Sequence, residues 1–272
     1  MNLEELVPGV CVIARRAADA ILAVYDSEFA VQHKDDRSPL TAADLAAHQT
    51  IVDGLQELTP EWPVLSEESA AIGWDERRQW TRYWLVDPLD GTREFVKRNG
   101  EFTVNIALIE DHVPVLGVVQ VPVTGEIAWA WQGGGAWIAI GNGEARRCRT
   151  RSRANPLIVA GSRSHANPRL LTMLEKLGPH EVKPLGSSLK FLRITAAEAD
   201  LYVRLGPTSE WDTAAAQCVL EQAGGAVTDL DGMPLRYNTR ESLLNPEFMA
   251  WGDPGGAWVE ALSCPDPDCA RD

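Results

Sequence analysis

The sequence has few cysteines, and their positions exclude two common uses of that residue. The five cysteines are scattered along 272 residues, and no two have the C-x-x-C spacing of a zinc site or a redox motif. An odd number without a regular pattern also argues against a disulfide framework. We therefore expect reduced thiols in a cytoplasmic protein.

Long hydrophobic runs and an excess of positive charge are also missing. No stretch approaches the roughly 18 apolar residues of a membrane-spanning helix, and residues 1–5 are acidic, unlike the start of a signal peptide. Asp and Glu number 39 against 25 Lys and Arg, a net charge of −14. This charge opposes binding to nucleic acid or to an anionic membrane. A homodimer, and attachment to the inner face of the membrane, are alternatives that the sequence leaves open.

The rest of the composition is that of a globular protein, at 45% hydrophobic residues. Apolar spacing predicts amphipathic helices over residues 2–27 and 42–58, the second with Thr41 as its N-cap. Alternating apolar residues predict short strands at 64–65 and 83–86, followed by an antiparallel meander from 102 to 140. After about residue 150, strands alternate with helices, including helices at 187–198 and 211–223. We expect one compact unit with an α+β half, 1–150, and an α/β half, 151–272.

The most informative stretch is an apolar run, residues 84–86, that ends in Asp87-Pro88-Leu89-Asp90-Gly91-Thr92. A buried strand that carries acids at its carboxyl end is a usual place for ligands in α/β folds. Two hard oxygen ligands on a rigid turn suit Mg²⁺ together with a substrate phosphate. The same letters are also good type I turn chemistry, so a plain turn is the alternative.

Three further acids extend the pattern, and each has an ordinary alternative. Glu67 follows the predicted strand at 64–65, where a solvated loop is the plain interpretation. Asp212 opens a predicted helix, where it would favour the helix dipole. Asp44 completes a capping box with Thr41. The functional interpretation joins Glu67 and Asp212 to a metal site, which needs several carboxylates, and pairs Asp44 with Thr92 to deprotonate a water molecule.

Taken together, the residues Glu67-Glu68, Asp87 to Thr92 and Trp211-Asp212 resemble the inositol monophosphatase-like superfamily of Mg²⁺-dependent, lithium-sensitive phosphatases. The sequences of segments 34–44, 93–107 and 186–191 are similar to those of one branch of this superfamily, the bacterial CysQ-type 3′(2′),5′-bisphosphate nucleotidases. The resemblance covers most of residues 30–255.

The resemblance implies a fold, a metal site and a reaction. The fold is a layered αβαβα sandwich of the α+β / α/β type. Two or three Mg²⁺ ions would be held by Glu67, Asp87, the Leu89 carbonyl, Asp90 and Asp212. Thr92 and Asp44 would activate water for an in-line attack without a phospho-enzyme. The substrate would be adenosine 3′,5′-bisphosphate, cleaved to AMP and phosphate, with 3′-phosphoadenylyl sulfate as a second substrate and a role in sulfur metabolism.

The strong negative charge means that the nucleotide needs local partners. A predicted helix begins with Ser187, Ser188 and Lys190, and the backbone N–H groups at a helix start favour an anion. Arg204, after a predicted strand, is a further candidate partner. The alternative for Lys190 and Arg204 is that each is a solvated surface charge. The full predicted substrate set comprises Glu67, Gly91, Thr92, His165, Ser187, Lys190, Arg204 and Asp212. Further candidates are Asp35, near a third metal, and Arg163 and Ser188.

Three other functions compete with this one. Inositol 1-phosphate or fructose 1,6-bisphosphate would use the same site. Haloacid-dehalogenase phosphatases carry Asp-x-Asp-Gly-Thr and form an aspartyl-phosphate, but here Leu89 stands where the second Asp should be. Asp229-Leu230-Asp231-Gly232 has that spacing and lacks the Thr, and we expect a hairpin turn there. A metal-dependent binding protein without activity is the third alternative.

Overall fold

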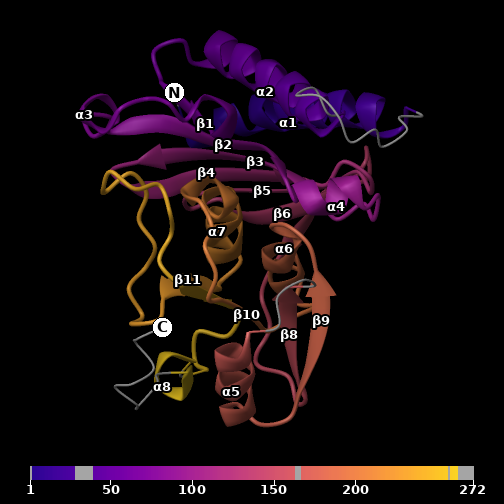
Figure 1. Ribbon diagram of the computed structural model, residues 1–272, viewed down its shortest axis with the longest axis vertical. Helices are drawn as coiled ribbons and strands as arrows, with labels where there is room; N and C mark the ends of the chain where they lie inside the picture. Colours follow the sequence, from indigo (N-terminus) through magenta and orange to yellow (C-terminus); the bar gives the residue numbers. More distant parts are fainter. Residues whose placement is uncertain (1, 28–38, 163–166, 257, 263–272) are drawn as a thin grey trace.

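The computed structural model describes residues 2–27, 39–162, 167–256 and 258–262. These residues form five layers, which Figure 1 shows from top to bottom as helices, sheet, helices, sheet and helices. The αβαβα sandwich expected from the resemblance is confirmed. In the described ranges no helix combines the length and the hydropathy needed to cross a membrane.

The first helical layer is an antiparallel pair, α1 (Leu3–Tyr25) and α2 (Pro39–Leu58), on one face of the first sheet. The predicted first helix is confirmed, with a buried face that recurs every three or four residues. The second helix begins earlier than predicted, at Pro39, a residue whose fixed φ favours the first helical position. Thr41 therefore lies inside the first turn, and its predicted roles as N-cap and as partner of Asp44 in a capping box are wrong.

The first sheet has seven strands in sequential order. Its first pair is parallel and the others are antiparallel, which confirms the predicted meander. The strands are β1 (Val64–Ser66), β2 (Arg82–Asp90), β3 (Thr103–Glu110), β4 (Val113–Gln120), β5 (Glu126–Trp131), β6 (Gly135–Ile140) and β7 (Arg146–Cys148). The connections hold a 3-10 turn η1 (Glu67–Ser69) and the short helices α3 (Trp74–Arg77) and α4 (Thr92–Val96).

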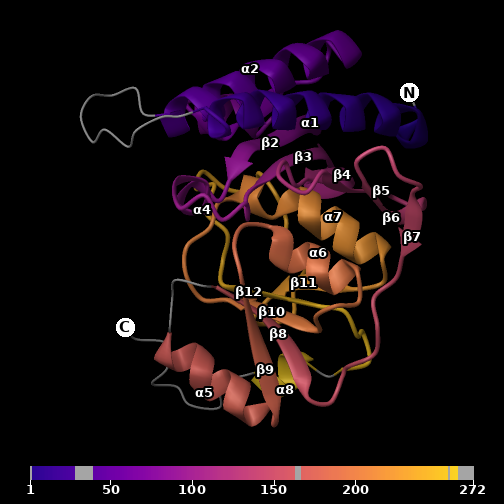
Figure 2. The ribbon, with the colours of Figure 1, turned by 90° about the vertical axis from the view of Figure 1, so that its right-hand side faces the viewer.

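The second sheet has five strands in the order β11-β12-β10-β8-β9. They are β8 (Leu157–Ser162), β9 (His180–Leu185), β10 (Leu201–Arg204), β11 (Ala226–Asp229) and β12 (Phe248–Trp251). Between the two sheets lie α6 (Leu189–Thr195) and α7 (Ala214–Gln222), both shorter than predicted (Figure 2). Helix α7 begins later than predicted because residues 210–212 form a separate 3-10 turn, η2 (Glu210–Asp212). The outer layer holds α5 (Pro168–Lys176) and α8 (Trp258–Leu262).

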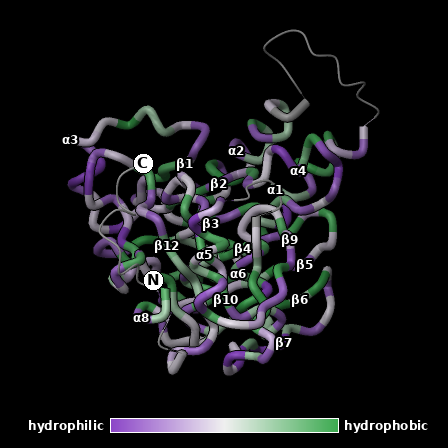
Figure 3. The backbone as a smooth tube through the Cα atoms, turned by 60° about the horizontal axis from the view of Figure 1, so that its bottom comes forward, coloured by the Kyte–Doolittle hydropathy of each residue, from purple (hydrophilic) through white to green (hydrophobic). Residues whose placement is uncertain are grey.

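Both faces of the first sheet are covered, and this explains the continuous apolar run of β2. Trp84 and Val86 pack into the cluster with α1 and α2, whereas Tyr83 and Leu85 pack into the cluster with α7. A strand buried on both faces needs apolar residues at every position. Figure 3 shows the hydrophobic segments gathered on the inner strands and the hydrophilic ones mostly at the periphery. At its far end β2 carries Asp87 into the layer between the sheets.

Candidate active site

Strand β2 continues beyond Val86 to Asp90, so both the predicted strand end and the alternative of a plain turn are wrong. Asp87 pairs with Asn105 and Asp90 with Thr103, so three steps along β2 face two steps along β3. This is a β-bulge, in which one strand holds an extra residue. Residues three apart in a regular strand point to opposite faces. The bulge cancels that alternation and turns Asp90 to the side of Asp87.

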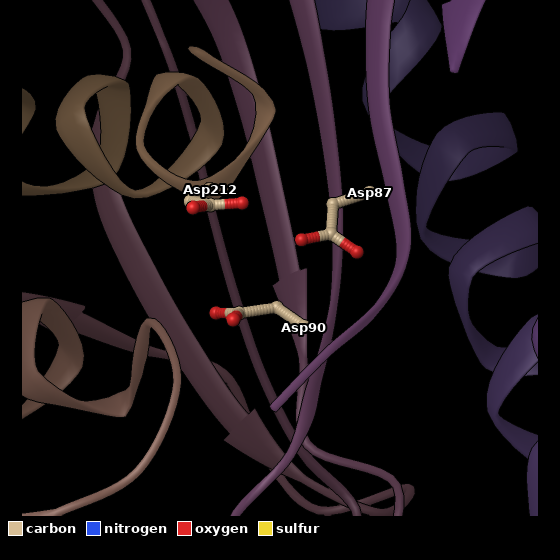
Figure 4. Close-up of side chains that lie close together, drawn as sticks. All are labelled: Asp87, Asp90 and Asp212. Atoms are coloured by element: carbon tan, nitrogen blue, oxygen red, sulfur yellow. The ribbon is translucent and has the colours of Figure 1, made fainter. Parts of the chain in front are cut away.

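A third carboxylate joins this pair from the other half of the chain. Ligand oxygens of Asp87, Asp90 and Asp212 all lie within 4.8 Å of one another, and Figure 4 shows the three carboxyl groups facing a common space. Asp212 ends η2, and its Oδ2 accepts a hydrogen bond of 2.9 Å from the N–H of Ser209. Asp212 therefore caps its own turn and faces the other two carboxylates at once.

Glu67 reaches the same cluster through the pairing of β1 with β2. The two strands are parallel, with Ser66 at the end of β1 beside Val86, so Glu67 leaves β1 next to the position of Asp87 on β2. Partial burial raises the pKa of Glu67, and the nearby charges of Asp90 and Glu68 raise it further. The side chains of Trp211 and Asp87 act in the opposite direction. Glu67 is thus electrostatically part of the carboxylate group.

The electrostatics of this group fit a bound cation. Burial raises the pKa of Asp87 well above its usual range, and the charges of Asp90 and Asp212 add to the effect. Burial, with repulsion from Asp90, also raises the pKa of Asp212 to about 7. Ionised carboxylates this close repel one another, and a divalent cation removes that repulsion. The donors are all oxygens, without His or Cys in the group, which suits a hard cation such as Mg²⁺.

Leu89 lies within the bulge. Its side chain is buried in the cluster with α1 and α2, and its N–H donates to Asp87 Oδ1 at 3.0 Å. This bond fixes the Asp87 carboxyl group from within the same strand. The Leu89 carbonyl as a metal ligand stays a prediction.

The two residues of the predicted catalytic pair, Asp44 and Thr92, come from helices α2 and α4. Asp44 on α2 is buried, and burial together with the charges of Glu68 and Glu67 raises its pKa to about 7. Thr92 is exposed at the first position of α4, directly after Gly91. Although both residues belong to the described part of the chain, the structure records no hydrogen bond between Asp44 and Thr92.

A cleft of about 860 Å³ opens beside the carboxylates. It brings together predicted site residues from both halves, namely Asp90, Gly91, Thr92, Ser187, Ser188, Lys190, Arg204 and Asp212. Three predicted residues, Asp35, Arg163 and His165, lie outside the described residues. The cleft is therefore a substrate-sized space directly continuous with the acidic cluster.

The cleft carries the local positive charge that an anionic substrate requires. Lys190 is buried, and its Nζ donates to the carbonyl oxygens of Ser187 (2.6 Å) and Leu185 (3.3 Å). Burial lowers the pKa of Lys190 to about 8, against the opposing effect of Asp90. Arg204 donates to the carbonyls of Gly206 and Pro207, which aims its guanidinium along the wall, and Arg93 adds a third cation.

Two residues of the site were not predicted, Thr103 and Asn105 on β3. Both are buried, and they contact Ser188, while Thr103 also contacts Asp90. They stand two apart and hence on one face of the strand. Polar side chains at such a spacing, inside an otherwise apolar strand, are the sequence signal that could have found them.

The late Asp-x-Asp-Gly sequence forms the turn that was predicted. Asp229 Oδ1 accepts hydrogen bonds from the N–H groups of Asp231 (3.0 Å) and Met233 (2.8 Å), and Gly232 has a φ of +86°. The carboxylate of Asp229 is engaged with its own backbone. It is therefore a turn-forming residue and not a phosphoryl acceptor.

A two-sheet sandwich with a carboxylate cluster at a strand end, beside a cationic cleft, defines the class of layered α/β metal-dependent phosphatases. The chain belongs to the inositol monophosphatase family, whose family model matches residues 2–253.

Three individual proteins show which members of this family the chain resembles. The chain is 52% identical over 241 residues to "3′(2′),5′-bisphosphate nucleotidase CysQ" of Escherichia coli (strain K12), covering 88% of this chain and 96% of that protein. The crystal structure of CysQ from Bacteroides thetaiotaomicron is 40% identical, with a TM-score of 0.81, and the match covers 90% of this chain and 96% of that one. An inositol monophosphatase from Zymomonas mobilis, at 24% identity and a TM-score of 0.73 over 96% and 99% of the chains, shares the fold.

Proposed function

We propose that this protein is a Mg²⁺-dependent 3′(2′),5′-bisphosphate nucleotidase that converts adenosine 3′,5′-bisphosphate to AMP and phosphate. The observation that carries the proposal is the meeting of Asp87, Asp90 and Asp212 beside a cleft lined by Lys190 and Arg204. The first feature suits a scissile phosphate with its cations, and the second suits the remaining phosphate. The 52% identity to a CysQ nucleotidase supports the same substrate.

Glu67, Asp87, Asp90 and Asp212, with the Leu89 carbonyl, are the residues that would hold two or three Mg²⁺ ions. When bound, such ions neutralise the scissile phosphate, stabilise the leaving 3′-oxygen and acidify a water molecule. The protein contributes a set of carboxylates whose spacing is fixed before the substrate arrives. The bulge in β2 and the cap at Ser209 provide this fixation.

Thr92 and Asp44 would receive the proton of the attacking water. Thr92 lines the cleft, and its hydroxyl can pass a proton to a carboxylate behind it. Asp44, with a pKa raised to about 7, suits a proton acceptor that works near neutral pH. The contact between them would form in the substrate complex, since catalytic hydrogen bonds often tighten only there.

The nucleotide would lie along the wall formed by Gly91, Ser187, Lys190 and Arg204. In this arrangement Lys190 and Arg204 face the phosphate that is retained in the product, and Ser187 faces the ribose or that phosphate. The pocket also has room for 3′-phosphoadenylyl sulfate, whose sulfate adds one further anionic group to the same wall. His165, Arg163 and Asp35 stay predicted contacts.

A substrate panel tests this proposal. Phosphate release is measured with Mg²⁺ from adenosine 3′,5′-bisphosphate, 3′-phosphoadenylyl sulfate, inositol 1-phosphate and fructose 1,6-bisphosphate, each with and without lithium. We expect the highest kcat/KM for adenosine 3′,5′-bisphosphate, and inhibition by lithium. A higher kcat/KM for inositol 1-phosphate or for fructose 1,6-bisphosphate would contradict the proposal and identify that compound as the preferred substrate.

Two further outcomes distinguish the remaining alternatives, an aspartyl-phosphate mechanism and a binding protein without activity. Acid quench during turnover should trap no phosphorylated protein, because the carboxylate of Asp229 is engaged in a turn and Leu89 interrupts the aspartyl-phosphate motif. A trapped aspartyl-phosphate would contradict direct attack by water. Release of no phosphate from any substrate would favour a binding protein without activity.

Cys11, Cys148 and Cys218 are free thiols, which fits a cytoplasmic location.

A further inference from the structure

Asp90 is held by a residue from the other half of the molecule. Its Oδ2 accepts a hydrogen bond of 2.6 Å from the backbone N–H of Ser188, which is 98 residues further along the chain. Ser188 borders the cleft and is only 1% exposed, and its hydroxyl is engaged with buried residues of β3. Its predicted contact with the substrate stays a prediction.

The hydroxyl of Ser188 joins a buried network on β3. It lies 2.8 Å from Thr103 Oγ1 and donates at 2.8 Å to Asn105 Oδ1. Because the Ser188 hydroxyl proton is directed to Asn105, the single hydroxyl proton of Thr103 is divided between Ser188 Oγ and Asp90 Oδ2, which lies 3.4 Å away. Thr103 is 0% exposed and Asn105 is 1% exposed, so water cannot replace these contacts. Buried polar groups of this kind have a fixed geometry, because each lost bond leaves an unsatisfied atom.

The connection between β9 and α6, residues 186–188, holds Ser188 close to this network. The N–H of Gly186 donates to Glu101 Oε2 at 2.9 Å, and a Cβ at Gly186 would lie 2.6 Å from the backbone oxygen of Glu101. Ser187 has a φ of +41°, a strained value for a residue with a side chain. The connection therefore approaches the start of β3 as closely as glycine allows, and the strain at Ser187 is sustained by contacts on both sides.

We propose that Thr103 and Ser188 are positioning residues that hold the Asp90 carboxylate in the orientation in which it binds a metal ion. One Asp90 oxygen is engaged by the Ser188 N–H and approached by the Thr103 hydroxyl, and this fixes the direction of the other oxygen. Outer hydrogen bonds to a ligating carboxylate commonly change metal affinity by about 10–100-fold. The inference rests on the role of Asp90 as a metal ligand in the proposed function.

The test is metal binding without substrate. Mn²⁺ binding is measured by electron paramagnetic resonance of the free ion in the wild type and in Thr103→Val, Thr103→Ser and Ser188→Ala. Thr103→Val, which removes the hydroxyl and keeps the shape, should raise the Kd for Mn²⁺ by about tenfold or more. Thr103→Ser, which keeps the hydroxyl, should bind within about twofold of the wild type. Ser188→Ala keeps the N–H to Asp90, so its loss should be smaller than that of Thr103→Val.

Thr195→Val is the matched control. Thr195 is a buried threonine on α6 whose hydroxyl has no hydrogen-bond partner among the described residues, so the same chemical change there should leave the Kd unaltered. A wild-type Kd in Thr103→Val, or equal weakening in Thr103→Val and Thr103→Ser, would overturn the proposal. Mn²⁺ binding that follows the expected order in a protein that releases no phosphate would refute the proposed function and leave the positioning role standing.

Discussion

Asp87 and Asp90 stand three residues apart on one strand, yet their carboxyl groups face the same space. The β-bulge opposite Thr103 and Asn105 produces this arrangement. Pro88, which has no N–H to donate, fits a strand only at an edge or a bulge, and here it lies within the bulge. The geometry of the metal site is therefore a property of the sheet register and not of the acidic residues alone.

Gly91 allows the chain to turn from β2 into α4, and its replacement should damage the site. Its φ is +96°, and a Cβ there would lie 3.0 Å from the Glu101 carbonyl oxygen and 3.2 Å from Ser187 Cβ. Gly91→Ala should lower the free energy of unfolding by at least about 1 kcal/mol, because positive φ is costly for residues with a Cβ. Gly73→Ala, with no atom within 4 Å of the new Cβ, is the control. Urea unfolding measures both, and equal midpoints would contradict the expectation.

Lys190 should distinguish nucleotides from simpler esters. Lys190 borders the cleft, and the proposed function places the retained phosphate of a bisphosphate beside it. Lys190→Ala should raise KM for adenosine 3′,5′-bisphosphate about tenfold to a hundredfold, as expected for a lost charged hydrogen bond. KM for a simple phosphomonoester should change much less. Lys183→Ala, an exposed lysine on β9, serves as the control, and equal effects on both substrates would remove Lys190 from the nucleotide pocket.

Without metal, the protein should lose stability as the pH rises. Unfolded carboxyl groups release their protons near pH 4, whereas Asp44 and Asp212 in the fold have pKa values raised to about 7, chiefly by burial. The folded state therefore binds more protons between about pH 4 and 7, and the free energy of unfolding falls across this window. Mg²⁺ should raise the Tm more at pH 8 than at pH 5, because it stabilises the ionised carboxylates.

Thermal unfolding with a chelator and with Mg²⁺ measures this effect. Asp212→Asn should weaken the dependence of Tm on pH in the chelator, since one of the carboxyl groups with a raised pKa no longer titrates. Asp75→Asn, at an exposed aspartate paired with Arg78, should leave the dependence as in the wild type. A Tm in the chelator that rises from pH 5 to pH 8 would contradict the raised pKa values of Asp44 and Asp212 in the fold.

The sequence predicted the layers and the acids, but not the geometry that unites them. Hydrophobic periodicity predicted most of the helices and strands, and the family resemblance implied their αβαβα order. The resemblance also named Asp87, Asp90 and Asp212, which the structure brings together, whereas Glu67 as a metal ligand stays a prediction. The bulge was missed because it depends on pairing with β3, whereas Asp-Pro-x-Asp-Gly has strong local turn chemistry. The Thr41 cap failed for a similar reason, since Pro39 begins the helix two residues earlier.

The role of Ser188 shows the other limit of sequence reasoning. At the start of a helix near Lys190, its position suggested an anion contact. In the structure its N–H and hydroxyl engage Asp90 and Asn105, which are far away in sequence, whereas the anion contact stays a prediction. Contacts between the two halves depend on how the sheets pack, and no periodicity or spacing in the sequence encodes them.

The most direct test of a metal-dependent nucleotidase compares the wild type with Asp90→Asn. Both proteins are incubated with Mg²⁺ and adenosine 3′,5′-bisphosphate, and the products are separated by chromatography. The wild type should release the 3′-phosphate and leave 5′-AMP, and Asp90→Asn should lower the rate by a factor on the order of 1000, a typical loss when charge stabilisation is removed from phosphoryl transfer. Near-normal turnover by Asp90→Asn, or 3′-AMP as the product, would contradict the assigned site.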